Sequence, residues 1–126
     1  MLKFYKCPHC GNLIAMIKDS TVVPVCCGDQ MMELKAGVSD GAFEKHVPVF
    51  TIDGCKVKVN VGEVNHPMTA AHLIEWIAIE TNQGCALKHL TDEETPDSEF
   101  SLSTDEKLVR VYAYCNLHGL RQKDAI

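Results

Sequence analysis

Apolar and polar residues alternate most clearly between residues 47 and 61. The segment VPVFTI (47–52) is followed by Asp53-Gly54, a dipeptide typical of tight hairpin turns, and then by KVKVNV (56–61), in which every second residue is valine. The alternation predicts two antiparallel strands joined by a tight turn.

Further short apolar segments follow, separated by NQG and by polar loops. They are LIEWIAIET (73–81), CALKHL (85–90), EFSLS (99–103) and LVRVYAY (108–114). Short strands at this spacing favour a β-sandwich. The segment TAAHLIEWIAIE (69–80) also fits a helix, because Ala70, Ile74, Ile77 and Ala78 fall near one helical face, and periodicity alone leaves both structures open there.

The first 36 residues differ from the rest of the chain. They hold four cysteines and little else that could form a core, and so short a segment normally needs a metal or a partner chain to fold. The stretch AGVSDGAFEKH (36–46), in which Gly37 and Gly41 flank polar residues, is typical of a connector. We predict a mainly β protein with a small metal-nucleated domain over 1–36 and a β-sandwich domain over 37–126.

Composition and charge narrow the function classes. The chain has 126 residues, of which 46% are hydrophobic, so a globular protein is expected. Twelve basic against seventeen acidic residues give a net charge of -5, and no basic stripe offers a surface for nucleic acid. No apolar run reaches the roughly 18 residues of a membrane span, and the start MLKFYKCPHC lacks a secretory signal, so we expect a cytoplasmic protein without a membrane partner.

Seven cysteines in a reducing compartment indicate metal or redox chemistry before disulfides. The first candidate site consists of Cys7, Cys10, Cys26 and Cys27. Four thiolates suit zinc or iron, and the chemistry alone leaves both open. Adjacent side chains tend to diverge, so the Cys26-Cys27 pair should distort a tetrahedral site, with Gly28 supplying a permissive backbone. His9 is interpreted as an exposed residue that is not a ligand, because four sulfurs complete the shell.

A second candidate site gathers histidines and a late cysteine. Its members are His46, His66, His72, Cys115 and His118. Each histidine alone would more often be structural, but these lie in predicted loops or at strand ends, where a sandwich can assemble a site. His89 lies inside a predicted strand and is left out.

Five motifs in order carry a family resemblance: CPHCGN, VCCGDQM, DGAFEKHVPV, NHPMTAAHLIEWI and YCNLHG. Together they resemble desulfoferrodoxin, the two-iron superoxide reductase, over essentially the whole chain. The resemblance implies a desulforedoxin-like domain whose four cysteines bind iron, and a neelaredoxin-like domain with an immunoglobulin-like sandwich. It therefore favours iron over zinc in the first site.

The resemblance also implies roles for the second set. His46, His66, His72 and His118 would be equatorial ligands of a non-haem iron and Cys115 its axial ligand, which leaves the position opposite the sulfur open, as in catalytic sites. Glu44 would be the sixth ligand of the ferric form, and Lys45 would draw in superoxide. Cys55 and Cys85 lie outside the pattern and are interpreted as packing or surface thiols.

The implied activity is reduction of superoxide to hydrogen peroxide, with electrons from rubredoxin or a similar donor, in a homodimer. Whether the first iron relays electrons or holds the module and a dimer together stays open. Two alternatives are kept: a zinc-binding interaction module, and an electron-transfer protein whose second iron is closed and inert towards superoxide.

Overall fold

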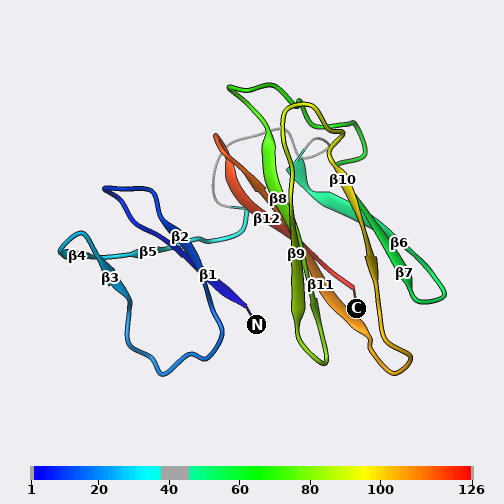
Figure 1. Cartoon of the computed structure of the whole chain (residues 1–126), viewed down its shortest axis with the longest axis horizontal. Helices are drawn as coiled ribbons and strands as arrows, with labels where there is room; N and C mark the ends of the chain where they lie inside the picture. The colour runs from blue at the N-terminus through cyan, green and yellow to red at the C-terminus, as the bar shows by residue number, and fades with distance from the viewer. Residues whose placement is uncertain (1, 38–45, 126) are drawn as a thin grey trace. The chain divides into compact units, whose positions relative to one another are not determined.

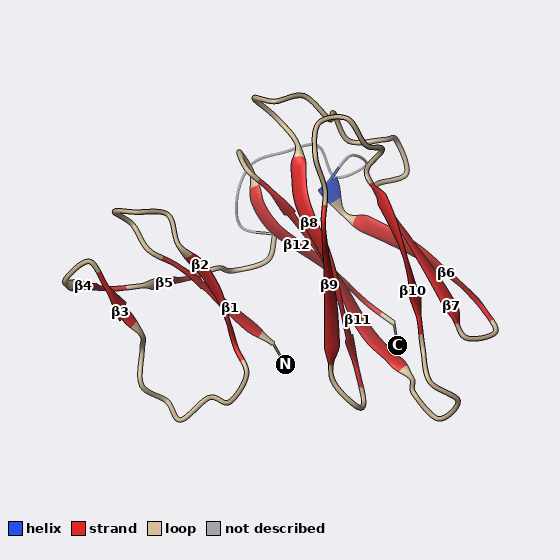
Figure 2. Cartoon of the chain, in the orientation of Figure 1, coloured by secondary structure: helices blue, strands red, loops and turns tan. Residues whose placement is uncertain are grey.

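The chain divides into two units, Met1–Lys35 and Ala36–Ile126 (Figure 1). The computed structural model describes residues 2–37 and 46–125. Strands and the loops between them dominate both units (Figure 2). Within the described residues, no helix has the length and apolar character needed to cross a membrane.

Very short strands build the N-terminal unit. Three of them form an antiparallel sheet in the order β2-β1-β5, and β3 pairs with β4. Their bounds are Lys3–Lys6 (β1), Leu13–Met16 (β2), Val25–Cys26 (β3), Asp29–Gln30 (β4) and Met32–Glu33 (β5). The buried hydrophobic side chains of this unit include Phe4, Tyr5, Cys7 and Met31, and the last three form one cluster, so a thiol is part of the core itself. So small a core is what a metal-nucleated module is expected to have.

The second unit is a sandwich of two antiparallel sheets, in the orders β10-β7-β6 and β12-β11-β8-β9. The strands are Pro48–Asp53 (β6), Lys56–Val61 (β7), Ile74–Thr81 (β8), Cys85–His89 (β9), Asp97–Ser101 (β10), Leu108–Cys115 (β11) and Gly119–Asp124 (β12). Three strands facing four is the arrangement of an immunoglobulin-like sandwich, so the predicted fold class is confirmed.

Alternation along β7 places its three valines in the core. Val57, Val59 and Val61 are buried and share one hydrophobic cluster with Ile77 and Val111 of the opposite sheet. Lysines alternate with the first two of these valines and are exposed, as the pattern predicted.

The helical alternative for residues 69–80 is wrong, because β8 runs through Ile74–Thr81 between β11 and β9. Six of its eight residues are buried, so both faces of the strand are covered. Apolar residues therefore occur on both faces, and the alternation of apolar and polar residues that marks a half-exposed strand is lost. The strand predicted at 99–103 lies at Asp97–Ser101. The final strand, β12, was not predicted, since GLRQKD shows little apolar alternation.

Candidate metal centres

Two turns bring the four N-terminal cysteines together. Cys7 and Cys10 lie in the turn between β1 and β2, where the Cys7 N–H donates to the Asn12 carbonyl at 2.8 Å. Cys26 ends β3 and pairs with Asp29 of β4. The two residues between them, Cys27 and Gly28, have φ values of 53° and 79°, which are the positive angles of a type I′ hairpin turn. The adjacent cysteines therefore converge because Cys27 itself, and not only Gly28, adopts the left-handed conformation.

The four sulfurs fit a tetrahedral metal site. All four ligand atoms lie within 4.8 Å of one another. The Cys10 and Cys26 sulfurs are 3.6 Å apart, and those of Cys26 and Cys27 are 3.9 Å apart. Thiolates about 2.3 Å from a tetrahedral ion lie about 3.8 Å from each other, so the observed spacing matches.

The surroundings of these sulfurs shift the pKa values of Cys7 and Cys27 in opposite directions. The backbone N–H groups of His9 and Cys10 donate to the buried Cys7 sulfur at 3.4 Å each. The Cys10 N–H first, with smaller help from that of His9, lowers the pKa of the Cys7 thiol to about 6. The crowded Cys10, Cys7 and Cys26 sulfurs raise the pKa of Cys27 to about 12. Metal binding at this cluster would therefore release protons.

The second candidate set meets at one end of the sandwich. His46 lies two residues before β6, His66 and His72 lie in the loop between β7 and β8, and Cys115 and His118 lie at the turn between β11 and β12. The start of β6 pairs with the end of β7, and the start of β8 pairs with the end of β11. Antiparallel pairing therefore carries segments distant in sequence to a common edge.

The four imidazoles are arranged as a ring of neighbours. Adjacent centroids are 4.5 Å apart for His46–His66, 4.7 Å for His66–His72, 5.2 Å for His72–His118 and 4.6 Å for His118–His46, with interplanar angles of 77° to 86°. His46 and His72 face each other across this ring at 6.1 Å. The order is that of four donors around a square.

Donor atoms in this ring lie at distances suited to one ion. Ligand atoms of His46, His66, His72 and Cys115 are within 4.8 Å of one another. His118 Nδ1 lies 2.8 Å from His46 Nε2 and 3.9 Å from the Cys115 sulfur. Two nitrogens at right angles, each about 2.1 Å from an ion, would be about 3.0 Å apart. All five predicted residues are thus brought together.

His66 provides an independent test of fit. Its ring is buried, and its Nδ1–H donates to the Pro67 carbonyl at 2.7 Å. The proton on Nδ1 makes Nε2 the nitrogen whose lone pair is available to a metal ion. Among the described residues, the buried Nε2 atom has no hydrogen-bond partner, a costly arrangement that a metal ion would relieve. Burial, more than the neighbouring histidines, lowers the pKa of His66 to about 4, so the ring is neutral and ready to act as a ligand.

Local hydrogen bonds order the loop that carries His66. The His66 N–H donates to the Val61 carbonyl at 2.9 Å. Asn60 Nδ2 donates to the Gly62 carbonyl at 2.8 Å and to Asn65 Oδ1 at 3.0 Å. Neither asparagine was predicted from the sequence to support the site, although an asparagine at a strand end is a usual signal of a side-chain turn.

Other residues considered from the sequence contribute no side-chain donor to either centre or lie outside the described residues. His9 is exposed, with its Nε2 atom 2.5 Å from Asp29 Oδ2. The thiols of Cys55 and Cys85 are free and exposed. Glu44 and Lys45 lie outside the described residues.

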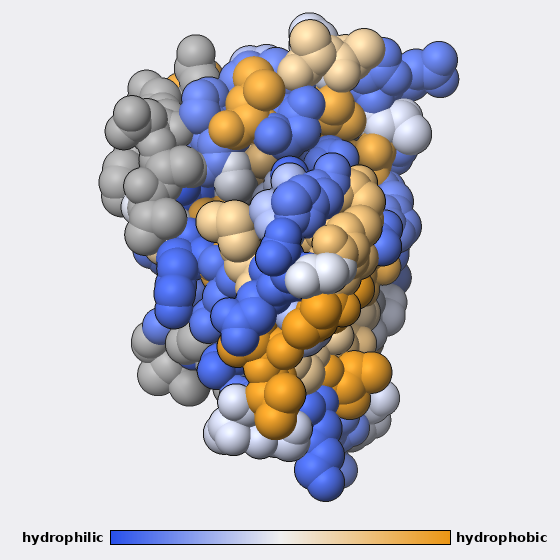
Figure 3. All heavy atoms as spheres, turned by 90° about the vertical axis from the view of Figure 1, so that its left-hand side faces the viewer, coloured by the Kyte–Doolittle hydropathy of each residue, from blue (hydrophilic) through white to orange (hydrophobic). Residues whose placement is uncertain are grey.

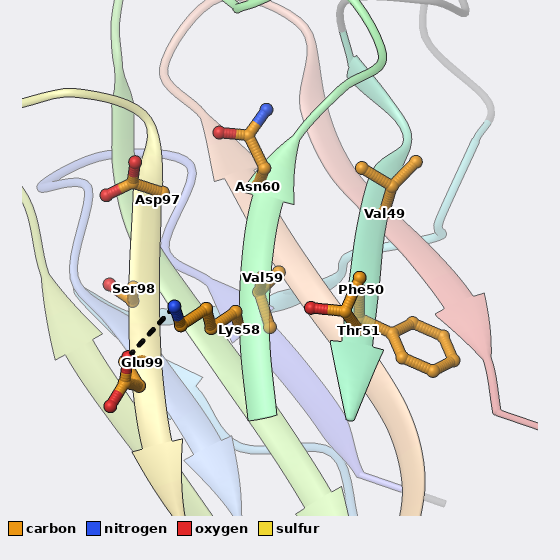
Figure 4. A pocket seen from close by; sticks show the side chains of 9 residues that line it. All are labelled: Val49, Phe50, Thr51, Lys58, Val59, Asn60, Asp97, Ser98 and Glu99. Atoms are coloured by element: carbon orange, nitrogen blue, oxygen red, sulfur yellow. Dashed lines mark ion pairs between the residues drawn. The ribbon is translucent and has the colours of Figure 1, made fainter. Parts of the chain in front are cut away.

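A groove of about 450 Å³ lies on the sheet formed by β6, β7 and β10 (Figure 4). Lys58 and Glu99 point towards each other across it, 3.9 Å apart. Among the described residues that line the groove there is neither histidine nor cysteine. It is therefore separate from the chemistry of the two candidate metal centres.

Comparison with known proteins gives consistent matches. The desulfoferrodoxin family model matches residues 38–124. The chain is 43% identical to the desulfoferrodoxin of Nitratidesulfovibrio vulgaris over 117 residues, which cover 93% of this chain and 91% of that protein. The superoxide reductase from Treponema pallidum is similar in structure, with a TM-score of 0.83, 34% identity, and coverage of 98% of this chain and 99% of that chain. The superoxide reductase (1Fe-SOR) from Giardia intestinalis matches with a TM-score of 0.55 and 29% identity over 64% of this chain and 95% of that chain.

Proposed function

We propose that this chain, which belongs to the desulfoferrodoxin family, is a superoxide reductase that converts superoxide to hydrogen peroxide. The observation that carries the proposal is the convergence of four imidazoles and one thiol at one end of the sandwich. Each turnover consumes one superoxide, one electron and two protons and returns no oxygen, so an external reductant must supply the electron.

The proposed ligands of the second iron are His46, His66, His72, His118 and Cys115. Iron held there would supply a redox-active centre with a position open to a small anion. A neutral His66 adds no charge and Cys115 offers one thiolate, so the donor set leaves a ferrous ion net positive. That local charge favours an anionic substrate although the protein is acidic overall.

Two further roles rest on the family resemblance alone. We propose Glu44 as the sixth ligand of the ferric form and Lys45 as the cation that draws superoxide towards the open position. Both follow from their place directly before His46 in the motif DGAFEKHVPV.

The N-terminal region, residues 1–36, is proposed as the desulforedoxin-like domain, with iron bound by Cys7, Cys10, Cys26 and Cys27. The spacing of the sulfurs supports a tetrahedral ion there. Residues 37–126 are proposed as the superoxide reductase domain, served by rubredoxin or a similar donor in the cytoplasm. Reduced rubredoxin should return the oxidised second centre to its ferrous form, and a centre that stays oxidised with that donor would contradict this part of the proposal.

A homodimer is proposed from the apolar surface of the N-terminal unit. Ile17 is 96% exposed, and Val22, Val25 and Met32 are also exposed in a unit with a very small core. Figure 3 shows hydrophobic side chains at the surface on the face that it draws. Such exposed apolar residues are typical of protein contacts.

Sedimentation analysis tests the dimer with two matched variants. Ile17→Lys should give a monomer, whereas Ile52→Lys, which charges an exposed isoleucine of the second unit, should leave the dimer intact. A monomeric unmodified protein would contradict the proposal.

The two alternatives are not favoured. A zinc-binding interaction module gives no purpose to the ring of imidazoles, and an inert electron-transfer protein does not agree with the matches to superoxide reductases.

Metal analysis, absorption spectra and pulsed superoxide test the function together. We expect two iron atoms per chain and superoxide-dependent loss of the reduced second centre. His72→Ala should lose that centre and the reaction, whereas His89→Ala, at an exposed histidine of β9, should keep both. Zinc in place of iron, or a reduced centre that ignores superoxide, would refute the proposal.

A further inference from the structure

Asn116 connects the turn that carries Cys115 and His118 to the loop that carries His72. Its side-chain Oδ1 accepts the Leu73 N–H at 3.0 Å, and its Nδ2 donates to the Ala71 carbonyl at 3.0 Å. Its backbone N–H donates to the Leu73 carbonyl at 3.2 Å. One residue therefore binds both chain neighbours of His72.

The strand pairing is irregular where these bonds form. Tyr114 pairs with Trp76 and Cys115 pairs with Ile74, so the register between β11 and β8 shifts at Cys115. Irregularities of this kind re-aim side chains and interrupt the ladder. Asn116 extends the contact between these segments to Leu73, the residue directly before β8. Its side-chain oxygen accepts the Leu73 N–H in place of a backbone carbonyl.

Thr69 completes the support of the His72 backbone. The His72 N–H is 3.1 Å from Thr69 Oγ1, and the His72 carbonyl accepts the Thr69 N–H at 2.9 Å. Thr69 thus binds the backbone of His72 itself, and Asn116 binds the residues on either side. The His72 ring, 5.2 Å from that of His118, is held by a backbone with little freedom.

We propose that Asn116 is a positioning residue of the second metal centre: its amide holds the His72 loop against the Cys115 turn so that both donors reach one ion. The inference rests on the proposed ligation by His72 and Cys115. Groups behind metal ligands commonly set ligand orientation and so the retention of the metal.

The chemistry of this bridge requires an amide. Asparagine presents an acceptor and donors in one planar group. Aspartate at position 116 would keep the bond from Leu73 and lose the bond to Ala71, and alanine would lose both. The two substitutions should therefore impair the centre in a graded manner.

Asn82 provides a matched control at the other end of β8. Its Oδ1 accepts the Lys107 N–H at 2.8 Å, and its Nδ2 donates to the Asp105 carbonyl at 3.4 Å. This bridge has the same chemistry, but β8 separates it from the candidate centre by roughly 25 Å at about 3.3 Å per residue.

The experiment measures transfer of iron from the loaded protein to a ferrous chelator, with the absorption of the four-cysteine centre as an internal reference. Asn116→Ala should release the second iron about 10–100-fold faster than the unmodified protein, and Asn116→Asp should fall between them. The thiolate-to-iron charge-transfer band of the oxidised second centre should also shift. Asn82→Ala and Asn82→Asp should leave the release rate and the band unchanged.

Equal release by Asn116→Ala and the unmodified protein would overturn the positioning role, as would an equal acceleration by Asn82→Ala. If Asn116→Ala does not fold, the pair Asn116→Asp and Asn82→Asp decides by the same criteria. An unmodified protein that holds iron only at the four-cysteine centre would instead overturn the proposed ligation, and this inference with it.

Discussion

Acidification should destabilise the metal-free protein through His66. The pKa of this buried histidine is lowered from about 6.5 to about 4, first by burial and then by the neighbouring histidines, while the Pro67 carbonyl opposes the shift. The unfolded chain therefore binds a proton at a pH where folded His66 stays neutral. Stability from this residue is fully present above about pH 6.5 and is lost as the pH falls towards 4.

The two pKa values set the magnitude. A difference of this size corresponds to at most about 3 kcal/mol, of which about 2 kcal/mol is lost between pH 7 and pH 5. Trp76, the single tryptophan, is buried in β8 and reports unfolding of the sandwich by fluorescence. Denaturant titrations at a series of pH values would give the free energy of unfolding of the metal-free protein and of His66→Gln.

The variant should lose about 2 kcal/mol less than the unmodified protein over this interval. His89→Gln, at an exposed histidine, should follow the unmodified protein. If His66→Gln and the unmodified protein decline in parallel, burial of a neutral His66 does not control the acid response, and the reasoning is refuted.

Three further substitutions test other parts of the molecule. Cys115→Ser should abolish iron binding at the second centre while the absorption of the four-cysteine centre persists; retained superoxide reduction would contradict the ligand assignment. Gly28→Ala should destabilise the N-terminal unit by about 1–2 kcal/mol, because Gly28 has a φ of 79° and a side chain there strains the backbone. The space around Gly28 is open, so the methyl group itself meets no clash. Thermal loss of the absorption of the four-cysteine centre measures the effect. Glu80→Gln should lower the free energy of unfolding by about 2 kcal/mol, because Glu80 Oε1 accepts hydrogen bonds from Arg110 at 3.0 Å and from Tyr112 at 2.7 Å. An unchanged midpoint of thermal unfolding would refute this prediction. In the same variant the pKa of Tyr112, which burial first and Glu80 second raise to about 12, should fall in an ultraviolet titration.

Strand prediction succeeded where only one face of a strand is buried. The valines of KVKVNV alternate with polar residues, and β7 has the predicted bounds. The segment at β8 was ambiguous because neighbours cover both of its faces, which removes the alternation. The polar strand β12 was missed because it is recognised mainly by its pairing with β11, and that partner is supplied by the tertiary structure.

The sequence predicted the local geometry of the first metal centre in greater detail than that of the second. Cys7 and Cys10 are three positions apart, and a local turn is enough to bring them together. The adjacent Cys26 and Cys27 were predicted to distort a tetrahedral site, with Gly28 supplying a permissive backbone, but the left-handed conformation of Cys27 was not foreseen. The roles of Glu44 and Lys45 stay predictions, because these residues lie outside the described residues.

By itself, the sequence determined the donor types and the local turns, because thiols, imidazoles and turn residues keep their chemistry and their short-range geometry in any fold. Only the tertiary structure decided which donors meet. His46 and His118 are 72 positions apart yet place two nitrogens 2.8 Å from each other, and Asn116 reaches residues 43 and 45 positions away. Such distances depend on how the sheets pair and pack, because a side chain's hydrogen-bond partner is chosen by proximity in space and leaves no period in the sequence.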